Sequence, residues 1–324
     1  MEKVVPNGQK YKVVRKNVSE YQGANFKQIE KKHLEIIPEI EYHWGEEVTE
    51  GNSPLILITT SQTKVEQISE EEYKNTKLLI HPNSGHDNLS YDFIKNAPFP
   101  IILGNPIRAH AVTNYILSAV FKHYSSFKKQ DEWDANRTWN RHLLNTKKVL
   151  LIGYGHIGKL VHQSLGPLVQ SMSIYDPEKG YKELEQKDCD LVIVAASLNP
   201  TSKYLVDKAF LTSLAKDFVL INPARGPIVN QLDLMEVLTK NKYATAYLDV
   251  FEQEPYKKID FLGMDNIITT SHIAGVYSSL NSEIIKYEFD VISKFIQTCD
   301  KIEEFKGFYK ELLLQNKIKE DYIL

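Results

Sequence analysis

The sequence has little cysteine and little glycine for its length. It holds two cysteines, Cys189 and Cys299, in 324 residues, too few for a disulfide framework or a cysteine-based metal site. This usage fits a reducing compartment, and the first residues lack the charged-then-apolar layout of a secretory signal. We therefore expect a cytoplasmic protein. There are 15 glycines, where average usage of about 7% would give about 23, so a cluster of glycines needs an explanation.

Long apolar runs and an excess of one charge are lacking too. No apolar run approaches the length of about 18 residues that a membrane-spanning helix needs. Lys and Arg number 39 and Asp and Glu 42, so the formal net charge is −3, and no block of like charges stands out. A nucleic-acid or membrane partner therefore has no support. No spacing of His, Cys and carboxylates is typical of a metal site, and we expect none.

The length favours two domains, each of alternating strands and helices. In the first hundred residues, apolar runs flanked by polar residues predict strands at 10–14, 55–59, 77–80 and 100–103. Between 147 and 270 the pattern is more regular and predicts strands at 149–152, 172–175, 191–195, 218–221, 245–248 and 266–269, with helices at 159–168, 206–214 and 231–240. Such repetition is the sequence form of a doubly wound parallel sheet, the Rossmann fold.

Two longer segments with helical apolar spacing flank this regular region. The segment 108–124 is expected to lead into the second domain, and 279–296 to lead back out of it into a polar, charged tail. We therefore predict an α/β fold with a cofactor domain at 108–279, inserted in a smaller, discontinuous substrate domain of 1–107 plus 280–324. The substrate domain is expected to be flavodoxin-like.

The glycine cluster lies where the first strand of the regular region ends. Gly153-Tyr154-Gly155-His156-Ile157-Gly158 follows the strand at 149–152 and opens a helix. A G-x-G-x-x-G pattern alone is weak, but here it stands in the context of a dinucleotide site. Its glycines allow a sharp turn, close approach of a pyrophosphate and tight packing of helix on sheet, and the helix N-terminus attracts phosphate.

An acid follows the next strand at the spacing expected for binding the adenine ribose. Asp176 comes 18 residues after Gly158, near the roughly 20 of the dinucleotide fingerprint. A carboxylate accepts hydrogen bonds from ribose hydroxyls and repels a 2′-phosphate, and Glu178 adds to that repulsion. We therefore predict NAD rather than NADP, against the alternative of a glycine turn without a cofactor.

Three later strands are each followed by a side chain with chemistry for hydride transfer. Arg225 follows the strand at 218–221, Glu254 follows 245–248, and His272 follows 266–269. Ligands of open parallel sheets bind beyond the carboxyl ends of the strands. An imidazole titrates near neutrality and suits a general acid/base, a carboxylate can orient it and favour its charged form, and a guanidinium pairs with a carboxylate substrate.

Each of these residues has an ordinary alternative role. Arg225 alone would be a surface cation, Glu254 a solvated loop acid, and His272 a satisfied core histidine. Their joint placement after successive strands of one sheet favours catalysis. With a nicotinamide cofactor carrying the hydride, they describe oxidation of a 2-hydroxy acid or reduction of a 2-oxo acid.

At these residues the chain resembles the D-isomer-specific 2-hydroxyacid dehydrogenases. The resemblance covers essentially the whole chain and is strong from Lys147 to Gly275. The segments that carry it are Gly153–Gly158, Asn222-Pro223-Ala224-Arg225-Gly226, Leu248-Asp249-Val250-Phe251-Glu252-Gln253-Glu254-Pro255 and Ser271-His272-Ile273-Ala274-Gly275, in family order.

The resemblance implies a role for each matched position. Arg225 would bind the substrate carboxylate, His272 would be the general acid/base, Glu254 would pair with it, and Asp249 would contact the nicotinamide carboxamide. It also makes 83–88 the substrate loop, with the N–H groups of Ser84, Gly85 and His86 facing the carboxylate; the residues alone indicate only a turn. The expected cofactor residues are Gly153, Gly155, His156, Ile157, Gly158, Asp176, Ala224 and Asp249. A homodimer is expected as well.

The chain departs from the family pattern in places. Ser271 stands where the family usually has Pro, and Thr113-Asn114 replaces an Ala-Glu pair of the linking helix. The loop 196–202 follows the family only loosely. Family formate dehydrogenases have Gln where this chain has Glu254, which argues against formate. A non-catalytic, NAD(H)-responsive regulatory protein, as in corepressors that resemble the family, stays the alternative to an enzyme.

Overall fold

The computed structural model describes residues 10–19, 22–45, 53–319 and 321–324. The chain forms two compact units, one of Met1–Arg108 with Val276–Leu324 and the other of Ala109–Gly275. Within the described part of the chain, no helix combines the length and the apolar character that crossing a membrane requires.

The second unit is built on a parallel sheet in the order β11-β10-β9-β8-β6-β7. Its strands are β6 (Lys148–Ile152), β7 (Ser171–Tyr175), β8 (Leu191–Val194), β9 (Val219–Asn222), β10 (Thr245–Leu248) and β11 (Ile267–Thr269). Each begins and ends within one residue of its predicted bounds. The predicted doubly wound sheet is confirmed. The chain crosses from one half of the sheet to the other between β7 and β8, so β6 and β8 flank the point where such sheets bind ligands.

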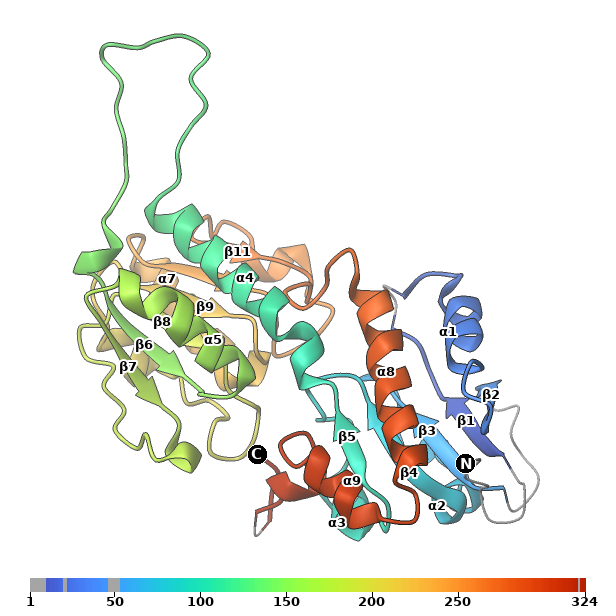
Figure 1. Cartoon of the computed structure of the whole chain (residues 1–324). Helices are drawn as coiled ribbons and strands as arrows, with labels where there is room; N and C mark the ends of the chain where they lie inside the picture. The colour runs from blue at the N-terminus through green and yellow to red at the C-terminus, as the bar shows by residue number, and fades with distance from the viewer. Residues whose placement is uncertain (1–9, 20–21, 46–52, 320) are drawn as a thin grey trace. The chain divides into compact units, whose positions relative to one another are not determined.

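Helices cover both faces of this sheet because its strands are apolar on both sides. Leu151 and Ile193 pack with α4 (Asn105–Tyr124) and α5 (His156–Leu165), and Leu150 and Val192 pack with α6 (Lys208–Thr212) and α7 (Gln231–Lys240). Figure 1 shows these layers, and a long arm, residues 125–143, that runs out from α4 and returns to the sheet. Short 3-10 turns in this unit are η4 (Leu144–Thr146), η5 (Gly166–Leu168), η6 (Pro177–Lys179), η7 (Gly226–Ile228) and η8 (Lys258–Phe261).

The first unit holds a second parallel sheet, in the order β2-β1-β3-β4-β5. Its strands are β1 (Tyr11–Arg15), β2 (Ile40–Trp44), β3 (Leu55–Ile58), β4 (Thr76–His81) and β5 (Ile101–Leu103). This is the flavodoxin order, as expected. The sequence patterns missed β2. It is an edge strand whose residues alternate between buried and exposed at Ile40, Glu41 and Tyr42, so it lacks the continuous apolar run of the other strands.

Both ends of the chain contribute helices to this unit. One face of the sheet is covered by α1 (Phe26–Leu34), α8 (Leu280–Gln297) and α9 (Ile302–Phe308), and the other by α2 (Glu70–Asn75) and α3 (Tyr91–Asn96), with the turns η3 (Val65–Gln67) and η9 (Leu314–Lys317) nearby. The tail, expected to be only polar and charged, contains α9 and buries Phe305 and Leu314 completely. It therefore belongs to the core of the first unit.

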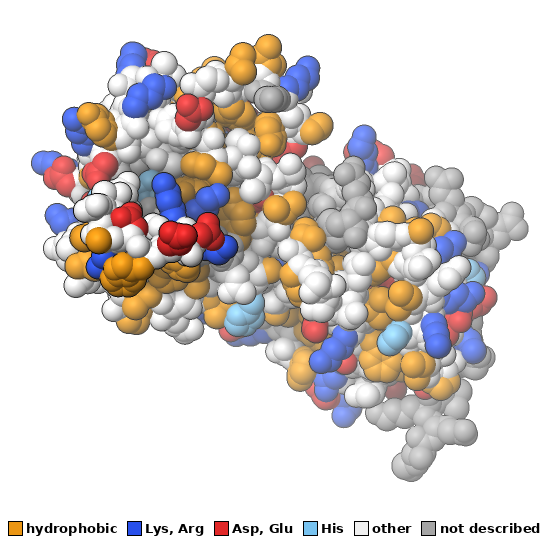
Figure 2. Space-filling view, turned by 90° about the horizontal axis from the view of Figure 1, so that it is seen from above, with side chains coloured by type: hydrophobic (Ala, Val, Ile, Leu, Met, Phe, Trp, Pro, Cys, Tyr) orange, Lys and Arg blue, Asp and Glu red, His pale blue; other side chains and the backbone are white. Residues whose placement is uncertain are grey.

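Charges of both signs are interspersed on one face of the molecule. On the face drawn in Figure 2, Lys and Arg side chains lie among Asp and Glu side chains and apolar groups, without a broad area of one sign. This mixture agrees with the small net charge of −3.

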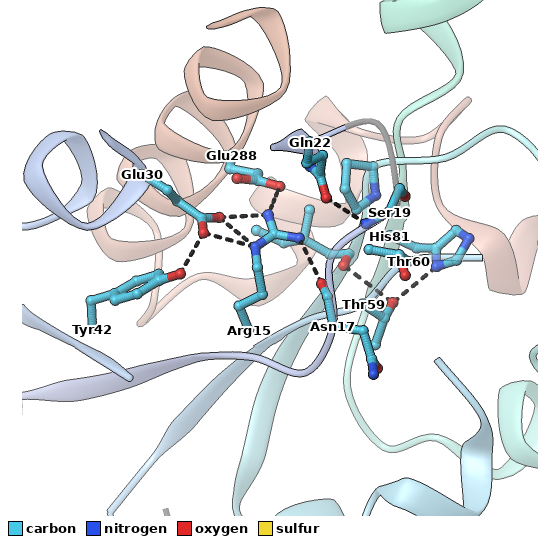
Figure 3. Close-up of polar contacts among 12 residues, drawn as sticks. Arg15, Asn17, Ser19, Gln22, Glu30, Tyr42, Thr59, Thr60, His81 and Glu288 are labelled. Carbon is cyan, nitrogen blue, oxygen red and sulfur yellow. Dashed lines mark hydrogen bonds and ion pairs between the residues drawn. The ribbon is translucent and has the colours of Figure 1, made fainter. Parts of the chain in front are cut away.

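A buried ionic cluster joins the two chain segments of the first unit. Arg15, at the end of β1, binds Glu30 of α1 (Nε–Oε1 2.6 Å) and also Glu288 of α8, and Tyr42 donates a hydrogen bond to Glu30 (Figure 3). The side chains of Arg15, Glu30 and Glu288 are fully buried. Burial raises the pKa of Glu288 well above its usual range, although Arg15 opposes this. A proton on Glu288 balances one guanidinium against two carboxylates.

Candidate active site

The glycine turn lies between β6 and α5, at the carboxyl edge of the second unit's sheet. Gly153 has φ of 94°, and a Cβ there would lie 2.6 Å from the backbone of Ala196. A Cβ at Gly158 would lie 2.1 Å from the carbonyl oxygen of Gly153. Neither position admits a side chain, because the backbone turns sharply at one and α5 packs against the turn at the other.

The space in front of Gly155 is open. A Cβ at Gly155 would meet only the Nζ atom of Lys179, 3.9 Å away. Gly155 is the N-cap of α5, and His156 and Ile157, both partly exposed, begin that helix. Room beside a helix N-terminus is what a dinucleotide pyrophosphate requires, so these residues fit the cofactor that the sequence predicts.

Asp176 lies against the same turn. Its Oδ2 accepts a hydrogen bond from the N–H of Tyr154 at 2.8 Å. Lys179 reaches over the turn, with Nζ 3.6 Å from that Oδ2 and 2.9 Å from the carbonyl oxygen of Tyr154. The sequence singled out Asp176 but gave no sign of Lys179, whose ammonium partly offsets the charge of the acid.

The loop after β9 holds Arg225 by internal hydrogen bonds. The Oδ1 of Asn222 accepts a hydrogen bond from the N–H of Ala224 at 3.1 Å, and its Nδ2 donates one to the carbonyl oxygen of Arg225 at 3.0 Å. Arg225 donates from Nη1 to the carbonyl oxygen of Ala224 at 2.8 Å. A Cβ at Gly226 would lie 1.9 Å from the carbonyl carbon of Phe251. This close approach brings the loop after β9 against the loop after β10.

Glu254 and His272 form a hydrogen-bonded pair. His272 Nδ1 lies 2.8 Å from Glu254 Oε2, and the N–H of Phe251 donates to Oε1 at 3.1 Å. The side chain of His272 is 51% exposed and that of Glu254 is 38% exposed, so both are accessible. Burial raises the pKa of Glu254, but the hydrogen bond and charge of His272, the N–H of Phe251 and the charge of Arg225 together bring it below its usual value. Arg225 and His272 therefore both act electrostatically on Glu254.

Asp249 holds the loop that carries His272. Its buried carboxylate accepts hydrogen bonds from the Oγ1 of Thr270 at 2.6 Å and from the N–H groups of Ile273 and Ala274, each at 2.8 Å. Its carbonyl oxygen accepts the N–H of His272 at 2.8 Å. His272 has φ of 53°, in the left-handed region, and these bonds stabilise a backbone conformation that is costly for a non-glycine residue.

Tyr115 and Thr270 support the site, and the sequence patterns missed both. The hydroxyl oxygen of Tyr115, on α4, lies 2.8 Å from the Oγ1 of Thr270. That Oγ1 donates a hydrogen bond to the carboxylate of Asp249. The sequence carries little sign of this contact, because the two residues are 155 positions apart. Of the departures noted above, Thr113 is buried and donates to the carbonyl oxygen of Ala109 at 2.8 Å, whereas Ser271 is exposed.

The predicted substrate loop belongs to the first unit and follows β4. Ser84 and Gly85 are partly exposed and His86 is buried. Among the described residues, the N–H groups of Ser84 and Gly85 donate no hydrogen bond to another protein group. Paired backbone N–H groups of this kind are typical of anion-binding turns. No cluster of three or more His, Cys, Asp and Glu side chains within the described ranges is placed to hold a metal ion.

The sequence is similar to a known protein family and to several characterised enzymes. Residues 115–274 match the family described as "D-isomer specific 2-hydroxyacid dehydrogenase, NAD binding domain". The erythronate-4-phosphate dehydrogenase of Blochmanniella floridana is 28% identical over 261 residues, covering 76% of this chain and 66% of that protein. The glyoxylate reductase of Pyrococcus furiosus is 26% identical over 245 residues, covering 67% of this chain and 72% of that protein.

The fold has solved counterparts. The NADPH-dependent glyoxylate/hydroxypyruvate reductase of Sinorhizobium meliloti, solved with NADP and malonate, superposes with a TM-score of 0.69 at 17% identity. The match covers 90% of this chain and 94% of that one. At this identity the likeness shows the fold only.

The fold and the glycine turn define a Rossmann-type protein that binds a nicotinamide dinucleotide. Through residues 115–274, the chain belongs to the D-isomer-specific 2-hydroxyacid dehydrogenases. The predicted family, the fold class and NAD as the cofactor are confirmed.

Proposed function

We propose that this protein is an NAD-dependent oxidoreductase that interconverts a small D-2-hydroxy acid and its 2-oxo acid by hydride transfer. The observation that carries the proposal is the hydrogen-bonded pair of His272 and Glu254, with Arg225 close to Glu254. A protein that only bound NAD(H) would have no need of an accessible imidazole oriented by a carboxylate. The alternative, an NAD(H)-responsive regulatory protein on the same fold, is therefore the less favoured.

In the direction of reduction, bound NADH supplies the hydride to the C2 atom of the 2-oxo acid. The proton comes from His272, by way of Nε2, because Nδ1 is bonded to Glu254. The proton goes to the carbonyl oxygen, which becomes the hydroxyl of the product. Glu254 stabilises the imidazolium before transfer, and Arg225 pairs with the substrate carboxylate through its planar guanidinium.

The loop 83–88 is the proposed second contact of the substrate carboxylate. The N–H groups of Ser84 and Gly85 donate to no other protein group in the part of the chain that the structure describes, which supports this role. His86 completes the set by resemblance to the family. We assign the unit of Met1–Arg108 with Val276–Leu324 to the substrate and the unit of Ala109–Gly275 to NAD.

A homodimer joined through the arm 125–143 is the proposed assembly. Three of its aromatic side chains are largely exposed: Phe127 by 88%, Trp133 by 85% and Trp139 by 75%. The base of the arm is closed by a hydrogen bond from the N–H of His142 to the carbonyl oxygen of Tyr124 at 2.8 Å. Large apolar groups in water favour association, and a second copy of the chain is the simplest partner.

We keep the cytoplasm as the proposed location. Cys189 and Cys299 are both free thiols. Burial raises the pKa of Cys189 to about 11, so that thiol is unreactive at neutral pH. Unpaired thiols fit a reducing compartment.

A panel of small 2-oxo acids tests the proposed activity. Each acid is mixed with NADH and the purified protein, and loss of the reduced-nicotinamide absorbance is followed. We expect rapid loss with at least one acid in the panel. If no acid causes oxidation while the protein binds NADH, the regulatory alternative is favoured and the proposed enzyme is wrong.

A further inference from the structure

A buried histidine at the end of β4 holds the proposed substrate loop. His81 is the last residue of that strand and is completely buried. Its Nδ1 lies 2.9 Å from the Oγ1 of Thr59, a contact drawn in Figure 3, and its Nε2 lies 2.8 Å from the carbonyl oxygen of Gly85. Thr59 follows β3 and is also buried. A buried polar chain therefore runs from β3 through His81 to the loop.

The protonation of His81 fixes the direction of both hydrogen bonds. Burial lowers the pKa of His81 to about 4, so the imidazole is neutral at physiological pH. A neutral imidazole has one donor and one acceptor nitrogen. The carbonyl oxygen of Gly85 only accepts, so Nε2 carries the hydrogen and Nδ1 accepts from the Thr59 hydroxyl.

Gly85 is the position where such an anchor matters most. Glycine has the widest backbone freedom of any residue, so a loop with a glycine at its centre is costly to order when a ligand binds. The hydrogen bond from His81 fixes the peptide that follows Gly85. Asn88 secures the other side of the loop, donating to the carbonyl oxygens of Thr60 at 3.0 Å and Thr63 at 2.7 Å. The N–H groups of Ser84 and Gly85 lie in the short stretch between His81, at the end of β4, and the carbonyl group of Gly85 that His81 holds.

We propose that His81 is a positioning residue for substrate binding, which presets the loop 83–88 so that its N–H groups receive the carboxylate of the 2-oxo acid. The inference rests on the proposed function, since it presumes that this loop binds the substrate. His81 itself touches no reacting atom. It acts by keeping Gly85 in one conformation before the substrate arrives, which lowers the entropy cost of binding.

Three substitutions separate positioning from folding. His81→Leu removes both hydrogen bonds, Thr59→Val removes only the bond to Nδ1, and His81→Gln keeps an N–H donor near the position of Nε2. We expect His81→Leu to raise the KM for the best 2-oxo acid by about 10- to 100-fold while the KM for NADH stays unchanged. Thr59→Val should give a smaller rise, and His81→Gln should restore most of the affinity. A purely structural role would lower the amount of active protein, and hence kcat, without this selective change in KM.

Hydrogen exchange gives a readout that does not depend on turnover. In His81→Leu, the amides of 83–88 should exchange at least about tenfold faster than in His81→Gln, with the strands of both sheets unaffected. If the protein reduces no 2-oxo acid but the loop loosens in this way, the proposed function fails and the anchoring role of His81 stands. If the KM for the 2-oxo acid is unchanged in His81→Leu, or the loop exchanges at the wild-type rate, the inference is wrong.

Discussion

His272 occupies a strained backbone position that its surroundings maintain. The left-handed φ of 53° is stabilised by Asp249, whose carboxylate binds the N–H groups of the two residues after the histidine. The order Asp249, Glu254, His272 along the chain predicts that strand-end loops meet. It does not predict that the carboxylate of Asp249 accepts its hydrogen bonds from the loop that carries His272, because side-chain partners depend on the path of the backbone. Contact of Asp249 with a nicotinamide carboxamide stays a prediction.

Replacement of the histidine tests its chemical role. We expect His272→Ala to lower kcat by about 10²- to 10⁴-fold, the usual contribution of general acid–base catalysis. Binding of NADH, measured by fluorescence titration, should change little, because the imidazole bonds Glu254 and not the glycine turn. His162→Ala, which alters a histidine of α5, is the control and should retain turnover. Wild-type turnover in His272→Ala would rule out the assignment.

Asp176 and Lys179 are expected to set cofactor preference in opposite directions. Asp176→Ala should reduce the preference for NADH over NADPH by about 10- to 100-fold, since it removes hydrogen bonds from ribose hydroxyls to a charged group and the repulsion of a 2′-phosphate. Lys179→Ala should sharpen the preference, because the ammonium lies 3.6 Å from the carboxylate and offsets its charge. The ratio of kcat/KM for the two cofactors measures both effects. An unaltered ratio in Asp176→Ala would mean that another residue reads the ribose.

At the scale of elements, the strands with continuous apolar runs could be predicted, whereas β2 and α9 could not. The central strands β6, β8, β9 and β10 are buried along almost all of their length, and so their sequences carry a strong signal. The edge strands β7 and β11 are only partly buried, and the regular alternation of strands and helices supported their prediction. The edge strand β2 has one exposed side, and α9 is a short helix with few apolar residues. Whether such segments join a core depends on what packs against them, which a single sequence does not specify.

The buried ionic cluster that joins β1, α1 and α8 should make the stability of the first unit depend on pH. Among the described residues, the ionisable groups around Glu288 include Arg15, Glu30, Tyr42 and Tyr287. Because its pKa is raised in the folded state, Glu288 retains a proton that the unfolded chain releases. Its contribution to the free energy of unfolding is therefore fully present below the ordinary pKa of Glu, and is lost as pH rises toward the folded pKa.

Glu288→Gln mimics the protonated side chain and should remove this dependence. Below the ordinary pKa of Glu we expect the free energy of unfolding to stay within about 1 kcal/mol of the wild type, because size and shape are kept. As pH rises above the ordinary pKa of Glu, the variant should become progressively more stable than the wild type. Urea unfolding at a series of pH values measures the difference. A difference that stays constant with pH would show that Glu288 is ionised in the folded protein.

At the scale of the whole molecule, the two sheets and the discontinuous first unit follow from the order of apolar runs and long amphipathic segments. The arm 125–143 does not, because it has no regular secondary structure and its aromatic residues are exposed in one copy of the chain. In the proposed dimer its conformation would depend on a partner surface that the sequence pattern does not reveal.

Polar substitution in the arm tests the proposed dimer. The double variant Trp133→Ser, Trp139→Ser should sediment as a monomer at concentrations where the wild type sediments as a dimer. Phe308→Ser, which alters a residue of α9 that is 66% exposed, is the matched control and should leave the assembly unchanged. A wild-type protein that is monomeric at high concentration, or a dimer unaffected by the double substitution, would refute the role of the arm.

The proposed reaction is tested most directly by following the hydride itself. The protein is incubated with the 2-oxo acid it reduces fastest and with NADH fully deuterated at C4 of the nicotinamide, and the product is resolved by chiral chromatography and mass spectrometry. We expect the D-2-hydroxy acid with one deuterium at C2. Formation of the L-isomer, a product without deuterium, or no product from a protein that binds NADH would contradict the proposed reaction.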